Sequence, residues 1–319
     1  MEVFFQVLAI LGITATILSL TERKAWWIRA VEFPRPQILV IMLITIFGLI
    51  LSKPEISWTN GILATVAFIS VIVQTWFIYP YFKISSRAVK NSTGSEKYKI
   101  SILIANVLMD NRTSHILVEQ INKYKPDIFL AVETDVWWEE QLKPATNDFP
   151  YCLTKPLDNT YGMLLFSKLP LKNGRIEYII KDEIPSAHAD VVLNDKVIKL
   201  SCLHPEPPAP GEAETSKPRD RELGRMARKI QKIDEPYIVI GDFNDVAWSK
   251  TSYLFESLSG LKDPRRGRGF LNTFHAKYPL FRWALDHIFI SEHFTLEKMK
   301  TLSYNGSDHF PVYVICAID

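Results

Sequence analysis

The chain has 319 residues, and its 37 basic and 35 acidic side chains leave a net charge of only +2. This near-neutral balance provides no global basic field for binding nucleic acid, and the length exceeds that of one average domain. The three cysteines, Cys152, Cys202 and Cys316, have no CxxC spacing. Their odd number argues against a disulfide framework or a zinc ribbon and favours buried free thiols.

Three uncharged apolar runs lie in the first 82 residues, at 3–20, 36–52 and 56–82. A transmembrane helix needs about 20 mostly apolar residues, so we expect residues 1–82 to form an anchor of three transmembrane helices. Each run could instead be a buried core helix, but little polar sequence is present here to cover three of them. Aromatic residues, which favour the membrane interface, lie near the ends of the runs: Trp26, Trp27, Trp58, Trp76, Tyr79 and Tyr81.

The basic residues around these runs are unevenly distributed. Only Lys53 lies between the second and third runs, whereas the other two flanking segments contain Arg23, Lys24, Arg29, Arg35, Lys83, Arg87 and Lys90. The positive-inside rule then predicts that the N-terminus lies outside and that everything after residue 82 is cytoplasmic. The start of the chain lacks the basic region of a cleavable signal peptide. We therefore expect a multi-pass protein of the inner or plasma membrane.

Residues 83–97 are polar and show no apolar periodicity, which predicts a linker. The remaining sequence, 98–319, alternates short apolar runs with amphipathic stretches. Its length is enough to bury a substantial core, so we expect it to form one soluble domain.

Short runs rich in Ile, Val and Leu, bounded by turn residues, predict the strands of this domain. They lie at 98–107, 127–132, 161–167, 175–180, 189–193, 196–203, 236–241, 285–291 and 310–316. Helices are predicted at 113–124, 218–232 and 248–258, the second of which has apolar residues at three- and four-residue steps. Strands and helices mixed in this way predict layered sheets with helices outside.

Polar side chains lie at or beside the ends of several of the predicted strands. They are Asn106, Glu133, His204, Asp242, Asn244, Asp286, Asp308 and His309. Each alone has a simpler explanation, because Asn and Asp at strand ends usually form turns and a single His is usually structural. Together, carboxylates, amides and two histidines at one rim of a sheet are what a divalent cation and a phosphate group require.

Asp242 and Asn244 show this pattern most clearly, because they directly follow the apolar run 237–241. Alternate side chains of an extended strand point the same way, so both would face one pocket. Mg²⁺ prefers oxygen ligands and is typically held by one or two carboxylates together with substrate phosphate. The absence of cysteine from the strand-end residues disfavours a structural zinc site.

The strand-end residues fall within motifs that resemble the endonuclease/exonuclease/phosphatase superfamily, which has the DNase I-like fold. The motifs are Asn106, Glu133, YGMLLFSKLPL at 161–171, LHPEPP at 203–208, GDFN at 241–244, LDHIFIS at 285–291 and SDHFPV at 307–312. The resemblance covers the whole predicted domain in the family's order. It implies an α+β fold, a four-layer αββα sandwich, and cleavage of phosphate esters that depends on Mg²⁺, or on Mn²⁺ in its place.

The same resemblance implies a role for each motif residue. Glu133 would be the principal metal ligand, with Asn106 beside it, and Asp308 would support the metal and the neighbouring histidine. No position of these motifs is lost, so the resemblance also implies an active enzyme.

The remaining motif residues would act directly in catalysis. Asp242 would orient the attacking water, and Asn244 would bind the phosphate. His309 would act with Asp286 as its carboxylate partner, since a carboxylate raises the pKa of an imidazole and fixes its tautomer. His204 would contact the phosphate or assist the leaving group. The division of acid and base roles between the two histidines stays open, because coupled groups share their protons.

Other polar residues carry weaker signals. His287 would point to the opposite face from Asp286 and is predicted to be structural, and His115, His188, His275 and His293 have no partner motif. The Pro-rich stretch 205–218 follows His204 and is either a simple connection or long enough to contact the substrate.

The loop DPRRGRG at 263–269 contains Arg265, Arg266 and Arg268. It is either a solvated charge run or a contact for phosphate or an anionic headgroup. We include Arg265 and Arg266 among the predicted substrate-binding residues, together with Asn244 and His204.

Two enzymatic functions and one non-enzymatic function are compatible with these residues. The first is a membrane-tethered phosphoesterase for a lipid-linked phosphate or pyrophosphate, because an anchor raises the effective concentration of lipid headgroups at the site. The second is a membrane-tethered nuclease, which the near-neutral charge and the absence of a long basic stripe disfavour. The third is a scaffold, which the complete polar set disfavours. We expect the first, with membrane lipids and a lipid-linked substrate as partners and no protein partner.

Overall fold

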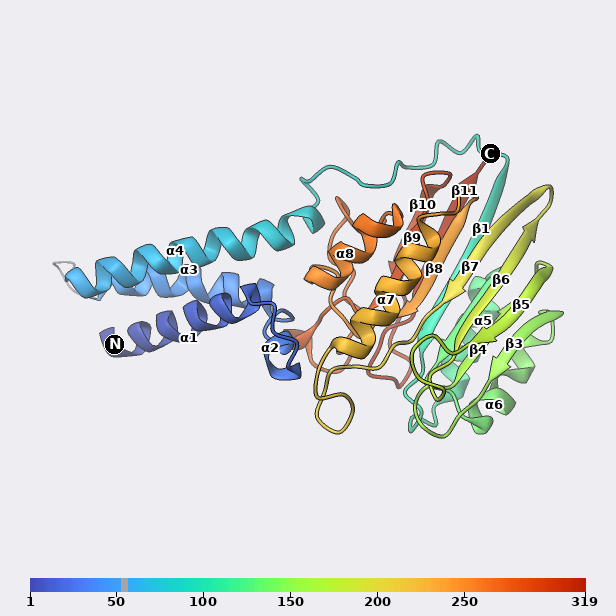
Figure 1. The fold of residues 1–319 in the computed structure, drawn as a ribbon, viewed down its shortest axis with the longest axis horizontal. Helices are drawn as coiled ribbons and strands as arrows, with labels where there is room; N and C mark the ends of the chain where they lie inside the picture. The colour runs from blue at the N-terminus through green and yellow to red at the C-terminus, as the bar shows by residue number, and fades with distance from the viewer. Residues whose placement is uncertain (53–56) are drawn as a thin grey trace.

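The computed structural model describes residues 1–52 and 57–319. Apolar helices at the N-terminus project from one side of an α+β domain that contains the rest of the chain (Figure 1). Lys53, the single basic residue predicted for the far loop, lies outside the described residues.

Three long helices and one short helix make up the N-terminal part. They are α1 (Glu2–Leu20), α2 (Trp26–Ala30), α3 (Arg35–Leu51) and α4 (Trp58–Ile78), followed by the 3₁₀ turn η1 (Tyr79–Tyr81). Of the described helices, two are long and apolar enough to cross a membrane by length and composition alone, namely Glu2–Leu20 and Trp58–Tyr81. Helix α3, with 17 residues, is shorter. Three spans were predicted, and the structure supports two of them on this criterion.

Polar side chains connect the three long helices to one another. Gln74 of α4 accepts a hydrogen bond from Arg35 (2.9 Å) and donates one to Thr16 (2.9 Å). Near the opposite end of the bundle, Gln6 of α1 donates to Asn60 of α4 (2.9 Å). Many large apolar side chains of these helices are exposed instead. A smaller apolar cluster, with Ile38, Met42 and Ala67 at its centre, is buried between the helices, whereas a water-soluble bundle keeps most of its large apolar side chains inside.

The domain contains two mixed β-sheets. The six-stranded sheet has the order β10-β11-β1-β2-β4-β3. Its strands are β1 (Tyr98–Asn106), β2 (Ile128–Val132), β3 (Tyr151–Lys155), β4 (Met163–Ser167), β10 (Thr295–Thr301) and β11 (Val312–Ile318). Strands β1 and β2 are parallel, so the chain ends of both, which carry Asn106 and Glu133, lie at the same edge.

The five-stranded sheet has the order β5-β6-β7-β8-β9. Its strands are β5 (Leu171–Glu177), β6 (Ser186–Leu193), β7 (Lys196–Cys202), β8 (Tyr237–Asp242) and β9 (Asp286–Ile290). Strands β7 and β8 are parallel, whereas β8 and β9 are antiparallel. The end of β8 therefore lies beside the start of β9.

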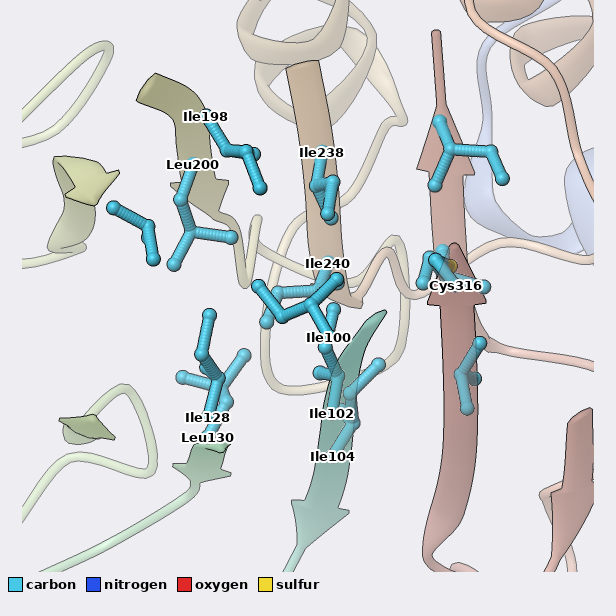
Figure 2. Close-up of a cluster of buried hydrophobic side chains, with 14 of the residues drawn as sticks. Ile100, Ile102, Ile104, Ile128, Leu130, Ile198, Leu200, Ile238, Ile240 and Cys316 are labelled. Atoms are coloured by element: carbon cyan, nitrogen blue, oxygen red, sulfur yellow. The ribbon is translucent and has the colours of Figure 1, made fainter. Parts of the chain in front are cut away.

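The two sheets pack face to face around a buried core of aliphatic side chains (Figure 2). Helices α5 (Ser114–Tyr124) and α6 (Val136–Thr146) pack on the outer face of the six-stranded sheet. Helices α7 (Lys217–Ile230) and α8 (Lys250–Ser259) cover the outer face of the other sheet. The predicted α+β fold with two internal sheets and helices on both outer faces is therefore present.

Several elements of the domain differ from the sequence prediction. Helix α6 and strands β3 and β10 were not predicted. Pro144 lies inside α6 and disrupts the sequence pattern of a helix, and β3 and β10 are edge or near-edge strands with many polar side chains. Of the cysteines, Cys202 and Cys316 are buried free thiols as predicted, but Cys152 is exposed.

The predicted linker, 83–97, lies along the domain. The backbone of Ser92 donates to Leu296 (2.9 Å), and Leu296 in turn donates to Lys90 (2.9 Å). Val89 is buried in the core between the sheets. The segment that joins the helices to the domain is thus fixed against β10.

Gly241, next to Asp242 in β8, has a backbone conformation that other residues rarely adopt, with φ of 140°. A Cβ at this position would lie 1.9 Å from the carbonyl oxygen of Leu203. The glycine therefore allows β8 to approach the chain that leads to His204, and it fixes the spacing of two predicted site residues.

We predict that Gly241→Ala lowers the free energy of unfolding by roughly 2–4 kcal/mol, because it adds both backbone strain and a backbone clash. The measurement is denaturation of the detergent-solubilised chain followed by circular dichroism. Gly224→Ala is the matched control, because Gly224 lies in α7 with only the flexible Arg228 side chain nearby, at 3.6 Å. That control should be neutral or more stable, by up to about 1 kcal/mol. Equal stability of the two variants would contradict the prediction.

Candidate active site

Two carboxylates and an imidazole meet at the junction of β8 and β9. The antiparallel register places Asp242 directly opposite Asp286. His309, from the loop before β11, lies with Nδ1 2.7 Å from Asp286 Oδ2 and Nε2 3.6 Å from Asp242 Oδ2. All three side chains are buried, so their charges interact strongly.

The ends of β1 and β2 bring two more polar side chains to the same place. The Asn106 amide nitrogen donates to Glu133 (2.6 Å) and to Asp242 (3.0 Å). Glu133 has a left-handed backbone, with φ of 58°, a conformation that is uncommon for a residue with a side chain and is often found at functional sites. Asn106 thus links the carboxylates of the two sheets.

Ser307 connects the last predicted motif to this edge. Its hydroxyl donates to the Asn106 carbonyl oxygen (2.8 Å) and accepts from the backbone of His309 (3.0 Å). Asp308 is half-buried beside it. The loop that carries Asp308 and His309 is therefore fixed to the end of β1.

Two overlapping groups of side chains could hold a metal ion. Glu133, His204 and Asp242 each offer a ligand atom, and these atoms lie within 4.8 Å of one another. Asp242, Asp286 and His309 form the second group, with the same separation. Asp308 belongs to neither group, and Asn106 now turns its amide nitrogen toward the carboxylates, so its oxygen could reach a cation only after the amide turns over.

The charges of this cluster fit a divalent cation. Burial raises the pKa of Glu133 to about 7, although the Asn106 hydrogen bond and His309 act in the opposite direction. Burial would lower the pKa of His309, but Asp286 and Asp242 raise it to about 10. The His309 imidazolium compensates part of the negative charge and, while protonated, offers no ligand atom. The carboxylates would then hold the cation, and oxygen ligands of this kind suit Mg²⁺ or Mn²⁺.

Asn244 is held beside Asp242 in the loop after β8. Its backbone amide donates to Asp242 Oδ1 (2.8 Å), and its side-chain amide donates to the Pro205 carbonyl (3.0 Å). The buried Arg219 of α7 donates to the Asn244 carbonyl (2.6 Å) and pairs with Asp245 (3.0 Å). The position of Asn244 therefore depends on a helix outside the sheet.

His204 lies at the end of β7, between the cluster and the Pro-rich loop. Its ring packs near Tyr161, with centroids 5.6 Å apart, and Tyr161 donates to Glu212 of that loop (2.6 Å). Burial lowers the pKa of His204, and its Nδ1 has no hydrogen-bond partner among the described residues. The ring is therefore neutral near pH 7 and can accept or donate through that nitrogen, depending on its tautomer.

A pocket of about 400 Å³ opens beside the cluster. Trp26, Ala30 and Phe33, from α2 and the turn after it, line one wall, and Phe274 and Trp283 line another. The site residues that reach the same pocket are Glu133, Asn244, Asp308 and His309. Among the described residues that line it there is no Lys or Arg.

The wall formed by α2 was not predicted from the sequence. The only signal was Trp26, which was interpreted as an aromatic residue at a membrane interface. A β-bridge joins Ala25 to Thr215 of the Pro-rich loop, and the Trp26 backbone donates to Glu214 (3.1 Å). The N-terminal part is therefore attached to the loop that follows His204.

The structure does not bring the predicted arginines to this pocket. Arg265 is fully buried behind the site, where it pairs with Asp263 (2.8 Å) and donates to the Asp286 carbonyl (3.2 Å). Arg266 pairs with Glu256 of α8 (2.9 Å). The prediction that Arg265 and Arg266 bind substrate is not supported, because both guanidinium groups are engaged in holding their own loop.

The other residues with weaker sequence signals have structural contacts. Arg268 donates to the Val89 carbonyl (2.7 Å) and so holds the linker. His287 is buried between Arg265 (2.7 Å) and the Asp245 carbonyl (2.9 Å), as its predicted structural role requires. His188 is buried between two serines.

A comparison with known protein families matches most of the domain to a single family. A model of the Endonuclease/Exonuclease/phosphatase family matches residues 103–309. The matched segment includes every predicted site residue. No match was found among curated protein sequences.

Solved structures with the same fold include three enzymes of different kinds. A mannosyl-6-phosphatase from Bacteroides thetaiotaomicron is 16% identical with a TM-score of 0.55, and the match covers 69% of this chain and 100% of that one. TDP2 from D. rerio, in complex with a single-strand DNA product, is 18% identical with a TM-score of 0.55, covering 69% and 99%. The human Nocturnin catalytic domain, with bound sulfate, is 17% identical with a TM-score of 0.56, covering 70% and 95%. At such identities the similarity shows the fold alone.

We predict that Glu133→Gln and His309→Ala each reduce kcat by about 10²–10⁴-fold, the range for removing a group that takes part in proton transfer or charge stabilisation. The measurement is hydrolysis of a chromogenic aryl phosphodiester with Mg²⁺, together with the melting temperature of each variant. His115→Ala is the control, because His115 is exposed on α5. Full activity of both site variants would show that this cluster is not the active site.

Proposed function

The chain belongs to the endonuclease/exonuclease/phosphatase family, and we propose that it is a membrane-anchored, Mg²⁺-dependent phosphoesterase that hydrolyses a lipid-linked phosphate ester or pyrophosphate. Members of this family are metal-dependent phosphoesterases and nucleases, so the chain is a hydrolase of phosphoric ester bonds. The membrane anchoring, the cation and the lipid substrate are the parts that we propose.

In this proposal Glu133 would hold the cation, with Asn106 beside it and Asp308 in support. A cation bound there would supply stabilisation of the negative charge that develops on the phosphate. Asp242 accepts a proton or a hydrogen bond from the attacking water, since its buried carboxylate belongs to both groups of side chains that could hold a metal ion.

The other side chains bind the phosphate and assist the leaving group. Asn244 offers its side-chain amide to a phosphate oxygen. His309, kept protonated by Asp286, donates a hydrogen bond or a proton at Nε2. His204 contacts the phosphate or the leaving group. The split of acid and base roles between the histidines is left open, as in the sequence analysis.

The pocket lining is the observation that supports a lipid substrate. One wall comes from α2, within the apolar N-terminal part, and no Lys or Arg is found among the described lining residues. Nucleic-acid binding depends mainly on Lys and Arg contacts to several phosphates, and this pocket offers none. An amphiphile with one phosphate group needs only the cation and an apolar wall.

The dimensions of α4 support a membrane anchor. Trp58 and Trp76 are both largely exposed, and they lie about 27 Å apart along the helix at 1.5 Å per residue. The hydrocarbon core of a bilayer is about 30 Å thick, with Trp enriched at both interfaces. In this arrangement Trp76 marks the interface next to the catalytic domain.

The substrate class can be tested with the full chain in lipid nanodiscs. We predict Mg²⁺-dependent release of phosphate from prenyl or alkyl phosphates and pyrophosphates, loss of release with EDTA, and recovery with Mg²⁺ or Mn²⁺. Single- and double-stranded DNA serve as alternative substrates, and Glu133→Gln is the inactive control. Efficient DNA cleavage without turnover of any lipid phosphate would favour the nuclease alternative and overturn the proposal.

The orientation predicts that the domain and the far ends of the helices are on opposite sides of the membrane. A reporter that is active only in the cytoplasm should be active when fused after Asp319 and inactive when fused before Met1. The physical reason is the excess of basic residues next to the domain. A reporter that is inactive after Asp319 and active before Met1 would show that the catalytic domain is on the non-cytoplasmic side.

A further inference from the structure

The loop before β9 has an exposed apolar tip. It is the 3₁₀ turn η2 (Pro279–Phe281) and the residue before it. Tyr278, Leu280 and Phe281 have exposed fractions of 57%, 77% and 58%. Exposing three large apolar side chains together in water is unfavourable, by about 25 cal/mol for each Å².

The tip lies beside the beginning of the apolar helices. Gln37, in the first turn of α3, donates a side-chain hydrogen bond to the Leu280 carbonyl (2.8 Å). From this turn onward α3 exposes large apolar side chains, including Val40 and Leu43. The tip is therefore at the level where the N-terminal helices leave the domain.

A continuous series of aromatic rings connects the tip to the active site. Ring centroids are 6.1 Å apart for Phe281 and Trp283, and 6.1 Å apart for Trp283 and Phe274. Phe274 lies 5.0 Å from His309. Phe33, from the turn after α2, packs against Trp283 at 5.6 Å. An apolar surface thus begins at the exposed tip and ends at the catalytic imidazole.

We propose that this aromatic surface is the hydrocarbon subsite of the enzyme and that the η2 tip inserts into the lipid interface at its entrance. The proposal rests on the proposed function, and it adds that the hydrocarbon part of the substrate is joined closely to the scissile phosphate. A large polar group between the hydrocarbon part and the scissile phosphate would lie against Phe274, where the described rings offer it few hydrogen-bond partners.

The aromatic rings could also stack nucleobases. Stacking sites for single strands are accompanied by basic side chains that follow the phosphate backbone. The pocket has no such side chain among its described lining residues, and the tip at the outer end of the ring series is hydrogen-bonded to α3. A lipid chain therefore fits this surface better than a nucleic acid.

The test compares two substrates that share one scissile group, a long-chain alkyl phosphate in nanodiscs and a soluble short-chain alkyl phosphate. Trp283→Ala and Phe33→Ala should each lower kcat/KM for the long chain by about tenfold or more, because a buried aromatic contact is lost. The ratio of kcat/KM for the long chain to kcat/KM for the short chain should fall by about the same factor, and an unchanged melting temperature shows that each variant is folded.

The tip is tested separately with the double variant Leu280→Ser, Phe281→Ser. It should raise KM for the long-chain substrate in nanodiscs by about tenfold and leave kcat nearly unchanged, because insertion affects access rather than chemistry. Tyr151→Ala is the control, since Tyr151 is an exposed aromatic residue (38%) on the edge strand β3 that does not line the catalytic pocket.

The experiments distinguish failure of this subsite proposal from failure of the proposed function. If the wild-type chain hydrolyses no lipid phosphate, the proposed function fails. If the wild-type chain prefers the long substrate and the ring and tip variants keep the same preference, the subsite proposal is overturned while the function stands. Loss of nucleic-acid cleavage in the ring variants would also overturn it, because the rings would then stack bases.

Discussion

The pairing of β8 with β9 is the constraint on which the site depends. It places Asp242 opposite Asp286 inside the protein, and two buried carboxylates so close together repel each other unless a positive charge lies between them. His309 supplies that charge, with one ring nitrogen toward each carboxylate. A one-residue shift in register would turn one of the carboxylates to the other face of the sheet, and the cluster would not form. The buried Gly241 and the aliphatic core on both sides of β8 hold this register.

The N-terminal part is coupled to the candidate site residues through ion pairs and hydrogen bonds. Lys24 pairs with Asp220 (2.8 Å), and Asp220 neighbours Arg219, which donates to the carbonyl of Asn244. The Trp248 indole, in the loop after β8, donates to the Glu32 carbonyl (2.9 Å). Because Arg219 and Trp248 are buried, breaking the contact of either would leave an unpaired group with a high desolvation cost. The helices therefore determine the shape of the site as well as its location.

The sequence was sufficient to predict the features that depend on local pattern. The strand and helix pattern predicted layered sheets with helices outside and singled out polar residues at the strand ends, including Asn106, Asp242 and His309. The two-sheet αββα arrangement was implied by the family resemblance. The failures concern features that depend on partners distant in sequence. Arg265 resembles a solvent-facing arginine until Asp263 and His287 enclose it. The role of Trp26 as a wall of the pocket depends on a bridge to the Pro-rich loop, about 190 residues later in the chain, which no local pattern reveals.

The absence of basic side chains from the pocket limits how an anionic substrate can be bound. Most phosphate-binding sites gain affinity from Lys, Arg or backbone amides, whereas here the described lining residues are acidic, neutral or apolar, apart from His309. The cation can supply the electrostatic part of binding, but it is shared with the carboxylates that hold it. The remaining affinity has to come from burial of apolar surface against Trp26, Phe274 and Trp283. A pocket of this composition discriminates against highly charged, water-soluble phosphates, because their other charges would be desolvated without compensation. The proposed selectivity for an amphiphile therefore rests on what the pocket lacks as much as on the residues that line it.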